Sequence, residues 1–230
     1  MTVPVLVLTF IPVAAAVLGA AVAVKARPGP SLVSAIQHFA AGVVFSAAAV
    51  EVIPDLMRDN APVATLVGGA TGVALMLLIM QLEARWKGPV GLLATTAVDL
   101  LVDGLVLGIS FAAGAKAGAL LTVALTLEVL FLGLTVAEAL RGKSGSALRA
   151  VAGTGVLMLA LPLGAVAAAP VANLSSTYIA GFLAFGLMAL LYLVTEELLV
   201  EAHEKPDSPW ITSLFFVGFL AVLLLDELIG

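Results

Sequence analysis

Three carboxyl side chains, Asp99, Asp103 and Glu128, lie deep inside long apolar segments of the sequence. An ionised carboxylate at the centre of a bilayer costs about 2.5–3.5 kcal/mol on insertion scales, so each group needs a partner, a proton or a water-filled cavity. Asp99 and Asp103 are one helical turn apart, which places both on one face of a helix. Carboxylates gathered in such a place can bind a cation or pass protons.

The three acids share one depth. Asp99 and Glu128 each lie about ten residues into a consecutive apolar segment, which at about 1.5 Å per residue is roughly 15–20 Å into a hydrocarbon core of about 30 Å. No Lys, Arg or His lies there to neutralise them. Either two or three carboxyls are protonated and hydrogen-bonded, or all three converge on a divalent cation that prefers oxygen ligands. We favour the cation, because three acids at one depth are hard to explain without a function.

The segments that carry these acids belong to a chain with the composition of a membrane protein. Of 230 residues, 62% are hydrophobic and 11% are charged, and the mean hydropathy is +1.21. We therefore expect an all-α polytopic membrane protein, with residues 1–230 forming a single transmembrane domain in the lipid bilayer. Eight apolar runs of spanning length are found at about 3–24, 32–53, 63–82, 89–112, 117–140, 147–166, 178–199 and 210–225.

Composition also excludes several classes of function. A net charge of -5 argues against nucleic-acid binding, which requires a basic face. The absence of cysteine removes disulfides and thiolate metal sites. The sequence has no P-loop, no G-x-S-x-G elbow and no H-E-x-x-H motif, so we expect neither an enzyme nor a bound cofactor. Intramembrane hydrolysis by Asp99 and Asp103 is the enzymatic alternative.

The distribution of basic residues predicts the orientation. Lys and Arg near span ends favour the cytoplasmic side. Odd-numbered loops contain or adjoin most of them, whereas even-numbered loops carry only Arg58 and Lys116. We therefore expect a multi-pass protein of the cytoplasmic membrane with both termini extracytoplasmic, and a first span that is retained rather than cleaved. The basic residues of the odd-numbered loops are Lys25, Arg27, Arg85, Lys87, Arg141, Lys143, Arg149 and Lys205.

Two spans end in similar acidic patterns. The second ends with Glu51 and Asp55, and the seventh with Glu197 and Glu201, each pair one helical turn apart. By the predicted orientation these spans run in opposite directions. This relationship is typical of an inverted repeat, an architecture that places a transport site near the midplane.

Other ionisable groups mark the two ends of a predicted transport path. Glu51 and Asp55 would gather cations at the extracytoplasmic end, with a solvated helix end as the alternative. His38, Glu196, Glu197 and Glu201 would lie toward the cytoplasmic end, although a single histidine in an apolar helix more often bonds to a backbone carbonyl. Glycines in several spans allow close helix packing, and the sequence leaves open whether one such face forms a homodimer. These glycines include Gly68, Gly69, Gly72, Gly104, Gly108, Gly181 and Gly186.

With eight spans, both termini outside and the patterns at 38–42, 51–55 and 196–203, the sequence resembles the Zrt/Irt-like (ZIP) divalent-metal transporters. In that family the fourth span carries His-Asn-x-x-Glu-Gly, which residues 99–104 match in position. The fifth span carries His-or-Gln-x-x-Pro-Glu-Gly, which residues 128–133 match when the glycines are aligned. The resemblance implies a three-plus-two-plus-three arrangement of helices and an elevator-like or rocking motion of the helix pair that holds the site.

The chain departs from the family pattern at several ligand positions. Leu100 replaces the Asn, Leu132 replaces the fifth-span acid, the proline is absent and the sixth span contains no acid. One site of three carboxylates is therefore expected rather than a binuclear centre. Loss of the His ligands favours Mn²⁺, Fe²⁺ or Mg²⁺ over Zn²⁺.

Together these patterns predict a transporter that moves a divalent cation of the zinc, manganese or iron class toward the cytoplasm. Asp99, Asp103 and Glu128 are the predicted ligands, and the ion is the substrate. Three alternatives stay open: a transporter of another substrate with the acids as a proton relay, a ZIP-like relative that no longer transports, and an intramembrane enzyme.

Overall fold

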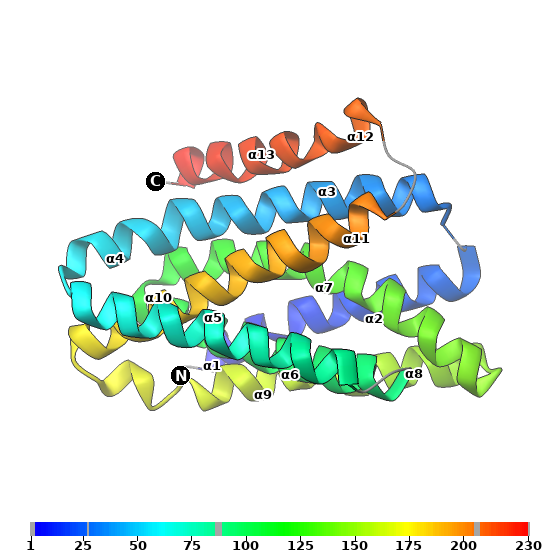
Figure 1. Cartoon of the computed structure of the whole chain (residues 1–230), viewed down its shortest axis with the longest axis horizontal. Helices are drawn as coiled ribbons and strands as arrows, with labels where there is room; N and C mark the ends of the chain where they lie inside the picture. The colour runs from blue at the N-terminus through cyan, green and yellow to red at the C-terminus, as the bar shows by residue number, and fades with distance from the viewer. Residues whose placement is uncertain (1–2, 27, 86–88, 205–207, 230) are drawn as a thin grey trace.

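A computed structural model describes residues 3–26, 28–85, 89–204 and 208–229 of the chain (Figure 1). Within these ranges all regular structure is helical, and eight helices are long and apolar enough to cross a membrane. The prediction of an all-α protein with eight spans is confirmed. The candidate spans are Leu6–Ala26, Pro30–Asp59, Pro62–Leu82, Leu93–Ala113, Ala115–Gly142, Ala147–Ala167, Ser176–His203 and Pro209–Leu228.

Several spans consist of more than one helical element. The two short π-helical segments, η1 and η3, interrupt the second and seventh spans, which are the spans with the paired acids. In chain order the elements are α1 (Val3–Leu8), α2 (Phe10–Ala26), α3 (Pro30–Ala47), η1 (Ala48–Val52), α4 (Ile53–Asp59), α5 (Pro62–Arg85), α6 (Pro89–Ala113), α7 (Ala115–Ser144), α8 (Ala147–Met158), α9 (Ala160–Ala167), the 3-10 helix η2 (Val171–Asn173), α10 (Ser176–Tyr192), η3 (Leu193–Leu198), α11 (Leu199–His203), α12 (Pro209–Thr212) and α13 (Leu214–Ile229).

The second span is longer than its apolar run. It was expected to end at residue 53, but η1 and α4 continue the helix to Asp59. Pro54 lacks the N–H that would bond within the preceding turn, and the wider π turn at η1 accommodates this loss. The helix ends at Asn60, which adopts the left-handed conformation with φ of 46°. As a result Asp55 lies within the helix, as Glu51 was expected to, rather than beyond its end.

The helices form two groups of four. The central group contains α2, α6, α7 and the α8–α9 pair, in which α2 packs along α7 and α6 packs along α9. The outer group contains α3, α5, α10 and α13, in which α3 packs along α13 and α5 along α10. The groups meet where α3 contacts α7 and where α10 contacts α6. Figure 1 shows that α1 begins and α13 ends at the same end of the bundle, here called the termini end.

Close backbone contacts reveal the inverted repeat. Gly72 of α5 lies against the carbonyl oxygen of Phe185 on α10, and Gly218 of α13 lies against that of Phe39 on α3. Neither position has room for a Cβ atom. Phe185 follows Phe39 by the same number of residues as Gly218 follows Gly72. When η1 is shifted along the sequence by this number, called the repeat offset, it falls within η3. The first three spans and the last three therefore repeat one structure, with α3 and α10 running in opposite directions (Figure 1).

The two middle spans, α6 and α7, are related in the same way. Gly104 on α6 lies against the Leu161 carbonyl of α9, and Gly133 on α7 lies against the Ala16 carbonyl of α2. The offset that relates Gly104 to Gly133 also relates Asp99 to Glu128. Three spans, two middle spans and three spans are thus arranged as predicted.

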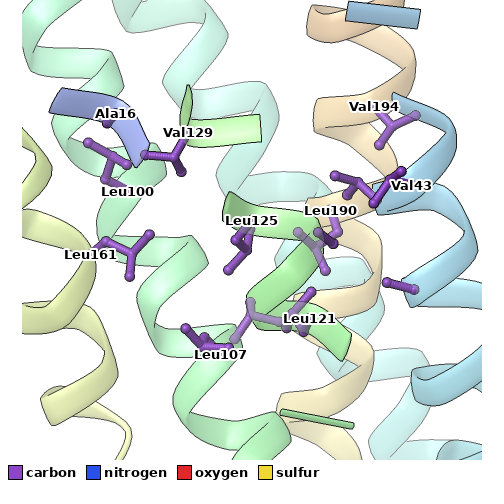
Figure 2. Close-up of a cluster of buried hydrophobic side chains, with 14 of the residues drawn as sticks. Ala16, Val43, Leu100, Leu107, Leu121, Leu125, Val129, Leu161, Leu190 and Val194 are labelled. Atoms are coloured by element: carbon purple, nitrogen blue, oxygen red, sulfur yellow. The ribbon is translucent and has the colours of Figure 1, made fainter. Parts of the chain in front are cut away.

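The main apolar core lies between the two groups. Figure 2 shows Val43, Leu190 and Val194 of the outer group to the right of Leu121 and Leu125 of α7, all in one apolar cluster. Leu100 and Val129, which directly follow Asp99 and Glu128, are fully buried in the same cluster. This packing holds α6 and α7 in register with each other, so that their acids lie at the same height.

Candidate cation site in the bundle centre

All three predicted ligands line one cavity. Asp99 and Asp103 reach it from α6 and Glu128 reaches it from α7, with Phe131, Leu132 and Leu193 among its apolar walls. The cavity has a volume of about 40 Å³. A volume above about 10–15 Å³ is enough for one water molecule, so the space can hold an ion with part of its hydration shell.

These carboxyls are removed from the surface. Asp103 is 2% exposed, Glu128 is 3% exposed and Asp99 is 8% exposed. Asp103 Oδ2 and Glu128 Oε2 have no hydrogen-bond partner among the described residues. Buried polar atoms are nearly always paired, and an unpaired one calls for an ion, a proton or water as its partner. Both oxygens therefore fit a cation that enters the cavity.

The acids also act on one another electrostatically. Glu128 interacts with Asp99 and with Glu197 of η3, and Asp103 interacts with Glu128 and Glu197. No described Lys, Arg or His lines the cavity. Like charges this close repel strongly in a low-dielectric interior, and a divalent cation would remove that repulsion.

The cavity is not a closed coordination sphere in this conformation. Among the described residues, no three His, Cys, Asp or Glu groups are arranged closely enough to hold a metal ion together. The three carboxyls therefore surround a space and do not yet converge on one point. Water molecules or a small movement of α6 against α7 would complete the shell of an oxygen-preferring ion.

The cavity continues away from the termini end along a row of polar groups. Glu197, Glu201, Gln37 and Thr135 line this part. Gln37 Nε2 on α3 donates a hydrogen bond of 2.8 Å to Glu201 Oε2 on α11. The structure thus brings the predicted pathway residues Glu197 and Glu201 into the same cavity as the central acids. Glu196, also predicted, is exposed and does not line it.

His38, the residue after Gln37, does not line this cavity. Its ring is 1% exposed, and its centroid lies 4.9 Å from that of His203 on α11. Nδ1 of His38 bonds to the Ser34 carbonyl oxygen at 2.9 Å, as expected for a histidine in an apolar helix. The Ser34 hydroxyl in turn donates to the Ala202 carbonyl at 2.9 Å. These contacts fasten α3 to α11 next to the cavity.

The two predicted residues at the termini end are separate from the cavity. Glu51 Oε1 lies 4.0 Å from Lys116 Nζ, and Asp55 Oδ1 accepts a hydrogen bond of 3.2 Å from Arg58. Neither side chain lines the space between the central acids. In this conformation the central cavity and the termini-end acids are therefore not joined.

No family model and no curated protein matches the chain. The assignment of a site thus depends on the chain's own geometry, and the ZIP resemblance remains a similarity of topology and local pattern. Two polar residues, one in the cavity wall and one in the ion pairs of the termini end, were not predicted from sequence. Gln37 is adjacent to the conspicuous His38, and Lys116 is one of only two basic residues in the even-numbered loops. The position of Gln37 next to His38, and the rarity of basic residues in the even-numbered loops, were the sequence features that could have pointed to these two residues.

Proposed function

We propose that the protein is a transporter that moves a divalent metal cation across the membrane through the central carboxylate cavity by alternating access. The observation that carries the proposal is the pair of unpaired buried oxygens, Asp103 Oδ2 and Glu128 Oε2, beside a cavity that Asp99 also lines. A cation satisfies both oxygens and removes the repulsion among the acids.

The inverted repeat supports the transport mechanism. In such transporters the site lies at the interface of the repeats, and one helix group moves against the other. In the repeat, α6 of one half corresponds to α7 of the other. Asp99 on α6 and Glu128 on α7 are equivalent residues of the two halves, which places both at that interface. With the basic loops in the cytoplasm, the polar row through Glu197 and Glu201 leads to the cytoplasmic side, which favours import. The resemblance to ZIP transporters agrees with this direction.

The choice of ion follows from the ligands. The cavity offers carboxylate oxygens, one amide and one threonine hydroxyl, and no described imidazole lines it. Such ligands favour Mn²⁺, Fe²⁺ or Mg²⁺, with Zn²⁺ and Co²⁺ as competitors. Under this proposal the protein is not an enzyme, and the metal is its substrate.

Uptake by purified protein in liposomes tests the proposal. Zn²⁺, Mn²⁺, Fe²⁺, Co²⁺ and Mg²⁺ are compared for the wild type, for Asp99→Asn/Asp103→Asn, and for the matched control Asp59→Asn, which changes an exposed carboxyl. We expect saturable uptake of at least one ion that the control retains and the double variant loses. Absence of uptake of every ion by folded wild-type protein refutes the proposal.

A proton relay is the second candidate, because the acids repel one another and do not form a ready coordination shell. It predicts proton flux in the same liposomes without metal, lost in Asp103→Asn. Metal-dependent flux that persists without a pH gradient contradicts it.

A further inference from the structure

An ion network joins three helices at the termini end. Lys116 Nζ, at the start of α7, lies 2.6 Å from Asp226 Oδ1 on α13 and 4.0 Å from Glu51 Oε1 in η1. The Glu51 and Asp226 carboxyls also interact electrostatically with each other. The Glu51 and Asp226 side chains are largely covered, at 13% and 19% exposed. Partial burial of this kind strengthens an ion pair relative to one in open solvent.

The network connects the two helix groups. Lys116 belongs to α7 of the central group, whereas Glu51 and Asp226 belong to the outer group. Movement that carries the start of α7 away from η1 and α13 separates Lys116 from its two partners. At the opposite end the groups are separated by the cavity that Glu197, Glu201 and Gln37 line. Ion pairs therefore join the two helix groups at the termini end, whereas a cavity separates them toward the opposite end.

The repeat indicates what the other conformation looks like. The offset that relates Phe39 to Phe185 also relates Glu51 to Glu197 and Asp55 to Glu201. Glu197 and Glu201 line the present cavity, so exchange of the two repeat conformations places Glu51 and Asp55 in an equivalent cavity that opens at the termini end. Glu51 can face that cavity only after it leaves Lys116.

The acidic residue that α13 contributes to the network has no acidic counterpart in the repeat. Asp226 corresponds by the same offset to Met80, which carries no charge. Met80 instead accepts a hydrogen bond of 3.0 Å at its sulfur from the Tyr192 hydroxyl. This asymmetry stabilises the conformation closed at the termini end relative to its counterpart.

We propose that Lys116, Asp226 and Glu51 form a lock that holds the termini end closed, and that release of Lys116 turns Glu51 toward the entering divalent cation. The inference rests on the proposed transport function. The Lys116 ammonium group pairs with the Glu51 and Asp226 carboxylates until the entering metal ion competes for them. It is a gating residue and does not contact the central site.

Cysteine labelling tests the lock directly, because the chain contains no cysteine. Val52→Cys reports on the termini end, and Leu198→Cys, its equivalent in the repeat, reports on the present cavity. A membrane-impermeant maleimide is applied to the termini side for Val52→Cys and to the opposite side for Leu198→Cys. Each probe is measured with Lys116 intact and with Lys116→Met, Lys116→Arg and the exchanged pair Lys116→Asp/Asp226→Lys.

We expect Lys116→Met to raise the labelling rate of Val52→Cys about fivefold and to lower that of Leu198→Cys, as loss of a partly exposed ion pair shifts the two populations. Lys116→Arg and the exchanged pair should stay near the original rates. Unchanged labelling of both probes in folded Lys116→Met overturns the lock. Should Lys116→Met not fold, Asp226→Asn replaces it with the same expectations.

Labelling requires no metal flux, so the two proposals fail separately. If the wild type takes up metal and Lys116→Met leaves the labelling rate of Val52→Cys unchanged, only the lock is refuted. A shift in labelling without uptake of any ion refutes the transport function and leaves the lock in place.

Discussion

Asp99 and Glu128 occupy equivalent positions on α6 and α7, and their carboxyls line the same cavity. Two residues that a repeat exchanges, and that also share a cavity, lie close to the axis of that repeat. A site on this axis is related equally to both ends of the bundle, as alternating access requires. Asp103 breaks the symmetry, because its equivalent is Leu132.

This equivalence predicts similar losses for two different substitutions. Asp99→Asn and Glu128→Gln each remove one charge from equivalent sides of the cavity while keeping its shape. We expect each to weaken metal affinity by at least about 10- to 100-fold, the range for disturbing even the outer shell of a metal site. Isothermal titration with Mn²⁺ in detergent measures both, and Asp59→Asn serves as the exposed control. A loss confined to one of the two variants would contradict a site on the axis.

Leu132 offers a gain-of-charge prediction. Leu132→Asp restores the acid that the repeat lacks and adds one carboxyl to the five that already line the cavity. Without metal we expect a lower Tm than wild type, because the added carboxyl increases the repulsion among like charges. With saturating Mn²⁺ we expect a larger rise in Tm than in wild type, since tighter binding stabilises the folded state more. Leu132→Asn, of similar size and uncharged, is the matched control. Equal metal-induced shifts in the two variants would count against a cation in this cavity.

The glycine contacts predict opposite outcomes for one substitution at two positions of the central helices. Gly104→Ala places a Cβ against the Leu161 carbonyl, which belongs to rigid helix backbone, and should lower stability by about 1–3 kcal/mol. Gly142→Ala, near the end of α7, meets no atom within 4 Å and should be neutral or stabilising by about 0.5–1 kcal/mol. Thermal unfolding in one detergent compares them. A destabilised Gly142→Ala or an unaffected Gly104→Ala would show that the helix contacts differ from those described.

Much of the candidate site could be predicted from the sequence, because a charged residue within an apolar segment is costly to place in lipid, and recognising it does not depend on knowing the tertiary contacts. Depth and helical spacing were enough to group Asp99, Asp103 and Glu128, and a helix end was enough to single out Glu197. Lys116 and Gln37 could not be assigned, because their partners Asp226 and Glu201 are distant in sequence and meet only through packing. His38 was predicted in the transport path by residue type, but its ring packs against His203 and is not among the side chains that line the cavity.

The orientation of the bundle is the remaining prediction, and the cysteine-free chain makes it direct to measure. Asn173→Cys is exposed at the termini end, and Ala147→Cys is exposed at the opposite end, where Arg141 and Arg149 flank the loop. Because basic loops stay in the cytoplasm, an impermeant maleimide added to intact cells should label Asn173→Cys and spare Ala147→Cys until the cells are opened. Unsubstituted protein controls for background. The reverse pattern would place Glu197 and Glu201 on the outer side, so that the cavity would collect the cation from outside rather than release it to the cytoplasm.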